Sequence, residues 1–209
     1  SWKYTNLNRL SRAGYGPLAD VPPVDVSAWS SLFVDGAIRI VIANGRYDED
    51  ASDIGALPDG VTLQPLSRAA EAGSEALGPV KTDADAPLVA LNTAFMRDGL
   101  VLKLSRGAIL DRPVQVLHLV DAGDTSLSVH PRTLVVAEEG AEATVIETFA
   151  GAAAGYWTNA VTEILVGRNA KIRHYKRQSE GEGGYHTAVT RVRLDRDAYY
   201  GGIALAVGG

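Results

Sequence analysis

The sequence predicts a mainly β protein, a parallel β-helix of stacked coils that follows a mixed α/β region. The first observation is an internal repeat, because residues 133–147, 162–176 and 190–204 can be laid over one another. The second is the content of each unit, which runs from β-rich residues through a polar three-residue turn to alternating apolar positions. A fixed period of 28 to 29 residues with strand residues in every unit is typical of a stacked architecture.

The first third of the chain lacks this repeat. Residues 1–30 are rich in Pro, Gly, Ser and aromatic residues, which predicts an extended arm. Residues 37–43 alternate as a strand does, and Asn44-Gly45 predicts a tight turn into a returning strand. A short strand is expected at residues 61–63.

Two helices are expected next. Residues 66–77 carry apolar side chains at helical spacing, and Asp85 is the expected N-cap of a second helix. One face of that helix should hold Leu88, Leu91, Asn92 and Phe95. Helix signals end at Gly99, so we divide the chain into an N-terminal α/β region with its arm, residues 1–97, and a β-helix core, residues 98–209.

The β-helix is expected to contain about four coils, the first of them built from strands at residues 100–104 and 114–120. Equivalent residues of parallel coils stack, which predicts an internal apolar column of Leu102, Val135, Ile164 and Val192. Burying one such side chain stabilises the fold by roughly 1.5–3 kcal/mol. The last coil leaves an open edge, through which we expect self-association unless something covers it.

Composition excludes several classes of function. The net charge of −5 argues against a nucleic-acid partner, and the longest apolar runs are too short to cross a membrane. No signal peptide is visible, and the absence of cysteine fits a reducing compartment, so a cytoplasmic location is expected. The four histidines have no metal-ligand spacing, and no metal site is predicted.

Catalytic candidates are weak, and no catalytic residue is predicted. Ser179 and His186 could act as nucleophile and base, but no carboxylate is placed in the sequence to orient the histidine. Paired carboxylates could cleave glycosidic bonds, as polysaccharide enzymes built on β-coils do. The candidates for such a pair are Glu138, Glu139, Glu142 and Glu147. Their simpler interpretation is a coil turn followed by solvent-facing positions.

Basic residues gather in the later coils, and two interpretations remain open for them. The strip comprises Arg168, Lys171, Arg173, Lys176 and Arg177, beside Arg191 and Arg193. Cross-coil ion pairs on a solvated face are the first interpretation, since Glu163 should stack on Arg191. A surface that binds a partner is the second. His174 falls at an inward position, which favours a hydrogen-bonded core residue.

Several sequence segments then occur in one order along the chain. They are residues 2–7 (Trp-Lys-Tyr-Thr-Asn-Leu), 90–95 (Ala-Leu-Asn-Thr-Ala-Phe), 99–104, 111–114, 132–136 with 140–147, 159–165 with 176–178, and 194–198. This order resembles the SufB/SufD family, and its SufD branch more closely than its SufB branch. The resemblance runs from Trp2 to Gly209.

The resemblance implies a component of iron–sulfur cluster assembly with a right-handed parallel β-helix core. Proteins of this branch pair with SufB through the β-helix and with the ATPase SufC through a C-terminal helical region, and the branch itself is not a known catalyst. It is implicated in iron acquisition. The resemblance also marks Lys176 and Gln178, which match a Lys/Gln strand end in the family.

We therefore expect a non-enzymatic subunit of a SufB–SufC–SufD scaffold, seen as an N-terminal and partial core fragment. By this hypothesis the fragment itself binds no cofactor, and the iron–sulfur cluster belongs to the full complex. A β-helix carbohydrate-active enzyme is the first alternative. A structural protein-interaction module unrelated to cluster assembly is the second.

Overall fold

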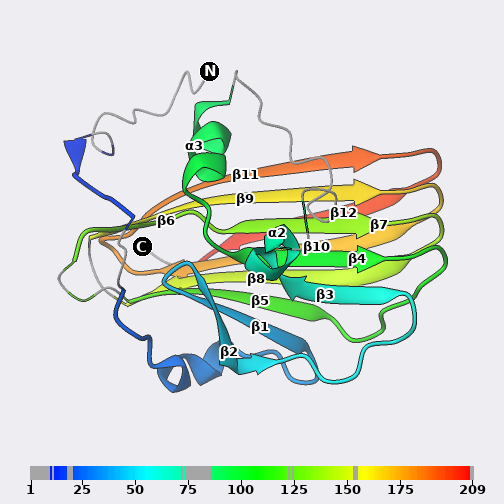
Figure 1. The fold of residues 1–209 in the computed structure, drawn as a ribbon, viewed down its shortest axis with the longest axis horizontal. Helices are drawn as coiled ribbons and strands as arrows, with labels where there is room; N and C mark the ends of the chain where they lie inside the picture. Colours follow the sequence, from blue (N-terminus) through cyan, green and yellow to red (C-terminus); the bar gives the residue numbers. More distant parts are fainter. Residues whose placement is uncertain are drawn as a thin grey trace.

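The computed structural model describes residues 10, 12–17, 21–71, 73, 86–121, 123, 125–152 and 155–207. Two β-sheets face each other across a shared apolar core, with two short helices outside (Figure 1). The elements are η1 (Val26–Leu32), β1 (Ile38–Ala43), β2 (Arg46–Asp53), β3 (Val61–Pro65), α2 (Leu66–Glu71), α3 (Pro87–Phe95), β4 (Gly99–Leu104), β5 (Val114–Val120), β6 (Leu127–Val129), β7 (Arg132–Ala137), β8 (Glu142–Gly151), β9 (Tyr156–Val166), β10 (Lys171–Glu180), β11 (Tyr185–Leu194) and β12 (Tyr199–Ala206).

Successive strands alternate between the two sheets, which makes the chain a β-helix. Sheet 1 has the order β12-β10-β8-β5-β1-β2, and sheet 2 has the order β11-β9-β7-β4-β3 with β6 against β9. Among strands β4 to β12 every pairing with one another is parallel. The predicted fold class is confirmed, as a parallel β-solenoid of about four turns.

The register confirms the predicted repeat. Leu102 pairs with Val135, Val135 with Ile164, and Ile164 with Val192, so these side chains form one column inside the coils. The first three are fully buried, while Val192 in the last coil is partly buried. Each coil therefore covers the apolar face of its neighbour.

The polar turns form a second column along one corner. Gly107, Gly140, Asn169 and Asp197 occupy the same place in successive turns and all have positive φ, between 57° and 72°. Glycine, Asn and Asp tolerate this left-handed conformation better than other residues. The turns are also bonded to one another, because the amide of Gly107 donates to Glu139 and that of Gly140 donates to Arg168.

The N-terminal elements extend both sheets. β1 pairs in parallel with β5, and β3 pairs antiparallel with β4. The strand, the Asn44-Gly45 turn and the returning strand were all predicted, and Asn44 has the left-handed φ of 47° that such a turn needs. The division at residues 97 and 98 stays a prediction.

Three expectations for this region need correction. At the end of the expected arm, residues 26–32 form η1, a 3-10 helix whose first turn is capped by the carboxylate of Asp25, while residues 1–9, 11 and 18–20 of the arm lie outside the described residues. Helix α2 ends at Glu71 and Gly73 is not helical, while residues 72 and 74–77 of the predicted helix lie outside the described residues. Helix α3 has Ala86 at its N-cap, the expected cap Asp85 lies outside the described residues, and Phe95 is 42% exposed. Val89 takes a buried place on the inner face, because the helix turns its Leu88–Asn92 side toward the coils.

Candidate functional site

The interior of the β-helix changes from apolar to polar along its length. In the earlier coils, Ile40 and Val116 of sheet 1 point inward. In the later coils, Glu147 and Lys176 continue the same column. The facing column of sheet 2 holds threonine in three successive coils, Thr133, Thr162 and Thr190. Polar side chains from both sheets therefore meet inside the later coils. We call this group the interior polar cluster, and its members are His118, Thr133, Glu147, Thr158, Thr162, His174, Lys176, Glu180, His186 and Tyr200.

Glu147 lies at the centre of the cluster and is 1% exposed. Its two carboxylate oxygens accept hydrogen bonds from the hydroxyls of Thr133 and Thr162, at 2.7 and 2.8 Å. His174 Nε2 lies 2.8 Å from Oε2, and His118 Nε2 lies 3.4 Å from Oε1 at an ion-pair distance. Two hydroxyl donors and two imidazoles therefore face this buried carboxylate, His118 without the alignment of a hydrogen bond.

These contacts hold Glu147 in its ionised form. Burial alone would raise the pKa of Glu147, but the interactions with His118 and His174 outweigh burial and bring the pKa well below its usual range. The far nitrogen of His174 lies 3.0 Å from the hydroxyl of Tyr200. When His174 donates a hydrogen bond from Nε2 to Glu147, its Nδ1 accepts a hydrogen bond from the Tyr200 hydroxyl. Glu147 thus orients the ring toward Tyr200.

Lys176 belongs to the interior polar cluster and not to the exposed basic strip, which corrects the sequence interpretation. Its ammonium lies 2.9 Å from His186 Nε2 and 4.9 Å from the centre of the Phe149 ring. Burial lowers the pKa of Lys176, although the charges of Glu147 and Glu180 oppose the shift. The alternation of β10 explains the placement, because Lys171 and Arg173 point outward while His174 and Lys176 do not.

A carboxylate does lie beside His186, and the expectation that none is placed there is wrong. His186 Nδ1 lies 2.8 Å from Glu180 Oε2, with an ion-pair distance but without the alignment of a hydrogen bond. The other oxygen of Glu180 accepts from the hydroxyl of Thr158 at 3.0 Å. The group facing His186 Nε2 is the amine of Lys176, whereas Ser179 precedes Glu180 on the opposite face of β10.

The second predicted residue, Gln178, lies between Lys176 and Glu180 on the inward face of β10. It is half-buried and pairs in register with Phe149 and with Ala206. A cavity of about 270 Å³ lies beside this face and is lined by His174, Lys176, Thr190, Tyr200 and part of β12. The structure therefore places Lys176 in a cavity wall, and functional roles for Lys176 and Gln178 stay predictions.

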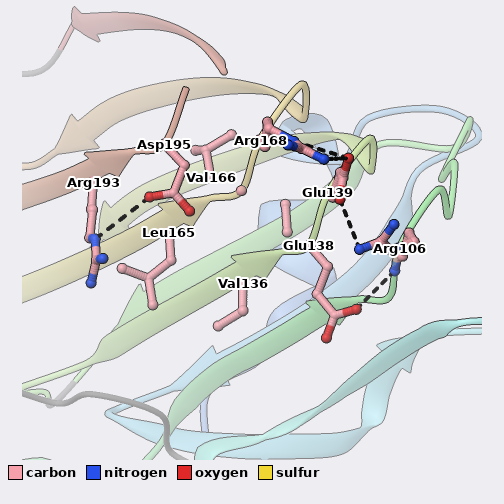
Figure 2. A pocket seen from close by; sticks show the side chains of 11 residues that line it. Arg106, Val136, Glu138, Glu139, Leu165, Val166, Arg168, Arg193 and Asp195 are labelled. Carbon is pink, nitrogen blue, oxygen red and sulfur yellow. Dashed lines mark hydrogen bonds and ion pairs between the residues drawn. The ribbon is translucent and has the colours of Figure 1, made fainter. Parts of the chain in front are cut away.

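The four glutamates proposed as a carboxylate group do not converge on one cleft. Glu147 is inside the coils, and Glu142 forms an ion pair with Lys171 on the outer face at 2.6 Å. Figure 2 shows Glu139 at the corner, held between the guanidinium groups of Arg106 and Arg168 at 2.8 and 2.6 Å. These contacts fit glutamates of a coil turn and of a solvated outer face better than they fit the paired carboxylates of a glycosidase.

The same corner borders an outer groove of about 490 Å³ on sheet 2 (Figure 2). Val136 and Leu165, from adjacent coils, are among its apolar residues, and Arg193 lies near one edge. The predicted stacking of Glu163 on Arg191 is confirmed, since the two residues pair in register, and Leu165 likewise pairs with Arg193. Over the described ranges, no group of three or more His, Asp or Glu side chains has the geometry of a metal site.

Sequence reasoning missed most of the interior polar cluster. His118, Thr158, Glu180 and Tyr200 were not singled out as its members, and Glu147 was considered only with the turn glutamates. The signal for Glu147 was present, because it continues the inward alternation of Ala143 and Val145. The meeting of His186 with Lys176 could not be found in this way, since it depends on how two sheets face each other.

Comparison with known proteins places this fold in a family. A model described as the SufBD protein N-terminal region matches residues 1–116. A model described as SUF system FeS cluster assembly, SufBD core domain, matches residues 118–209. The chain belongs to the SufB/SufD family. The resemblance inferred from the sequence segments is confirmed, and membership supports a role in iron–sulfur cluster assembly.

Curated relatives agree with the family models. The chain is 28% identical over 213 residues to the iron–sulfur cluster assembly SufBD family protein slr0076 of Synechocystis, covering 95% of this chain and 47% of that protein. It is 28% identical over 202 residues to the iron–sulfur cluster assembly protein SufD of Escherichia coli, covering 95% and 45%. This SufBD-family chain therefore spans about half the length of the relatives it matches.

Proposed function

We propose that this chain is a non-catalytic component of a SufB–SufC–SufD assembly that pairs with SufB and works with the ATPase SufC in the cytoplasm. The cluster is the cargo of the whole complex, and this chain supports iron acquisition and cluster assembly without a resident cofactor. Family membership over both matched regions is the observation that carries the proposal. No helix among the described residues is long and apolar enough to cross a membrane.

The outer face of sheet 1 supports binding to another protein. Tyr175 on β10 and Tyr199, Ile203 and Leu205 on β12 lie on adjacent strands at outward positions. Their exposed fractions are between 38% and 62%. Four large exposed apolar side chains on neighbouring strands form a patch of the kind that marks protein interfaces. Self-association through the last coil, which also presents this patch, stays a competing prediction.

The test is co-purification. The tagged chain is co-expressed with SufB and SufC from the same organism, and we expect SufB to be retained. A variant carrying both Ile203→Asp and Leu205→Asp should lose SufB, because two charges would enter the apolar patch. Ile109→Asp is the matched control, since Ile109 is 55% exposed and pairs with Glu142 on the side of β8 away from β10 and β12.

Other outcomes separate the alternatives. Failure of the unaltered chain to retain either partner would contradict the proposal. Retention of the chain by itself, as a homodimer lost in the double variant, would assign the patch to self-association instead.

A further inference from the structure

The basic strip of the later coils divides into cations that have a carboxylate partner and cations that have none. Four of them lie at ion-pair distance from a carboxylate: Arg168, Lys171, Arg191 and Arg193. A fifth, Lys176, is inside the coils. No described side chain pairs with Arg173 or Arg177, which are both exposed on the outer face of β10. Two guanidinium groups are therefore available to another molecule.

These two arginines stand on either side of the apolar patch. Tyr175 lies between them on β10 and pairs in register with Ile203 of β12. On its other side Tyr175 pairs with Ile146 of β8, so one apolar row crosses three strands. Four residues of extended strand span about 13 Å, and the two positive charges flank the row at that spacing.

The uncovered part of the outer face of sheet 1 is positively charged. Segment η1 covers β1 and β5, where Trp29 packs against the cluster that contains Val41 and Leu117. Along β8, β10 and β12, which the structure describes in full, Glu142 is the single outward carboxylate, and it already pairs with Lys171. This face is therefore positive, although the whole chain has a net charge of −5.

We propose that this face binds an acidic protein surface, with an apolar centre and carboxylates on both sides of it, and that Arg173 and Arg177 steer that surface into place. The assignment rests on the proposed function, where the partner is SufB, and adds the charge that the contacting face of SufB carries. Arginine suits the role because its planar group can bind a carboxylate through two parallel hydrogen bonds. The aliphatic row at the centre favours a protein over a nucleic acid, because protein interfaces combine an apolar core with a polar rim.

The experiment measures how fast the chain binds to immobilised SufB from the same organism. Between about 0.1 M and about 1 M salt, the distance over which exposed charges act falls from about 10 Å to about 3 Å. Charges at the rim of an interface act mainly on the rate of association. We expect association of the unaltered chain to slow about tenfold over this range of salt.

A variant carrying both Arg173→Glu and Arg177→Glu should associate about tenfold more slowly at the lower salt, and added salt should no longer slow it. Its melting temperature should be unchanged, because neither arginine has a partner among the described residues. Arg68→Glu with Arg106→Glu is the matched control. It changes the total charge equally at exposed positions, on α2 and at the corner of sheet 2, and should keep the salt dependence of the unaltered chain.

The outcomes separate this proposal from the proposed function. Binding to SufB at a rate that neither salt nor the arginine variant changes would overturn the acidic partner surface and leave the proposed function intact. No binding to SufB at either salt concentration would contradict the proposed function and this proposal together. Salt-sensitive pairing of two copies of the chain, lost in the arginine variant, would also overturn the proposal, because the acidic surface would then belong to this chain.

Discussion

The guanidinium of Arg132 lies 2.6 Å from the carboxylate of Glu163, in the adjacent coil and close to helix α3. The Arg132 side chain is fully buried and that of Glu163 is 9% exposed. A second nitrogen of Arg132 donates to Asn92 and Thr93 of the helix, at 3.2 and 3.1 Å. One buried cation therefore joins two coils to the helix outside them.

Removing one partner of this pair should destabilise the fold strongly. Glu163→Ala leaves the Arg132 charge buried without its carboxylate, and we expect the free energy of unfolding to fall by about 3–5 kcal/mol. Urea unfolding followed by circular dichroism measures the change. Lys171→Met is the control, because it breaks an exposed pair with Glu142 and should cost less than about 1 kcal/mol. Similar losses in the two variants would contradict this account.

Asn92 should be needed to hold helix α3 on the coils. Its amide nitrogen donates to the carbonyls of Pro131 and Asn159, at 2.9 and 2.8 Å. Asn92→Ala leaves both buried carbonyls without this donor, and we expect a loss of about 2–4 kcal/mol. Hydrogen exchange should show faster exchange in residues 87–95. Ala94→Asn, on the exposed side of the same helix, should leave both measurements nearly unchanged.

Gly99 is a position that no larger residue can occupy. A Cβ atom there would lie 1.8 Å from the carbonyl oxygen of Arg132. Gly99→Ala must therefore push β4 away from β7, and we expect insoluble protein or a large drop in thermal stability. Gly16→Ala is the control, because a Cβ atom at Gly16 would have no neighbour within 4 Å. A soluble Gly99→Ala variant with unchanged melting temperature would disprove this explanation.

The sequence predicted the coils well because the repeat carries register information. Once residues 133–147, 162–176 and 190–204 are laid over one another, the column of Val135, Ile164 and Val192 follows, and the structure has the same pairs. Side-chain alternation would also have placed Lys176 inside, since it is an odd number of residues from the outward Lys171. Assigning it to the basic strip used charge and ignored this alternation.

Contacts between the sheets could not be predicted in the same way. The period fixes which residues stack within a sheet, but it does not fix which column of sheet 1 faces which column of sheet 2. His118 and His186 come from different sheets, and both contact the ring of Phe149, with centroids 4.4 and 4.9 Å away. The contacts of α3 could not be predicted from the period either, because Asn92 forms hydrogen bonds to residues 39 and 67 positions away.

Glu147→Gln should cost stability in a pH-dependent way. The substitution removes a charge that two threonine hydroxyls and two imidazoles surround, and about 1–3 kcal/mol should be lost near neutral pH. Because the pKa of Glu147 is lower in the folded state than its usual 4.5, its contribution is complete above that value. It is lost as the pH falls through the folded-state pKa. Urea titrations should therefore show a deficit that is largest above pH 4.5 and narrows in acid.

His130 should make the fold sensitive to acid over a different range. Burial lowers the pKa of His130 from 6.5 to about 4, with Phe95 and Trp157 against the ring. Between these values the unfolded chain binds a proton that the folded chain does not, so stability falls as the pH decreases from 6.5 to 4. The total loss is up to about 3 kcal/mol.

His130→Gln should flatten this dependence, because glutamine does not titrate. The measurement is the free energy of unfolding at intervals from pH 4 to 7. Ser128→Ala is the matched control: it removes the hydroxyl 3.2 Å from His130 Nε2 but keeps the histidine. We expect Ser128→Ala to lower stability by about 1 kcal/mol with the slope preserved. An equally steep slope in His130→Gln would show that another group causes the acid sensitivity.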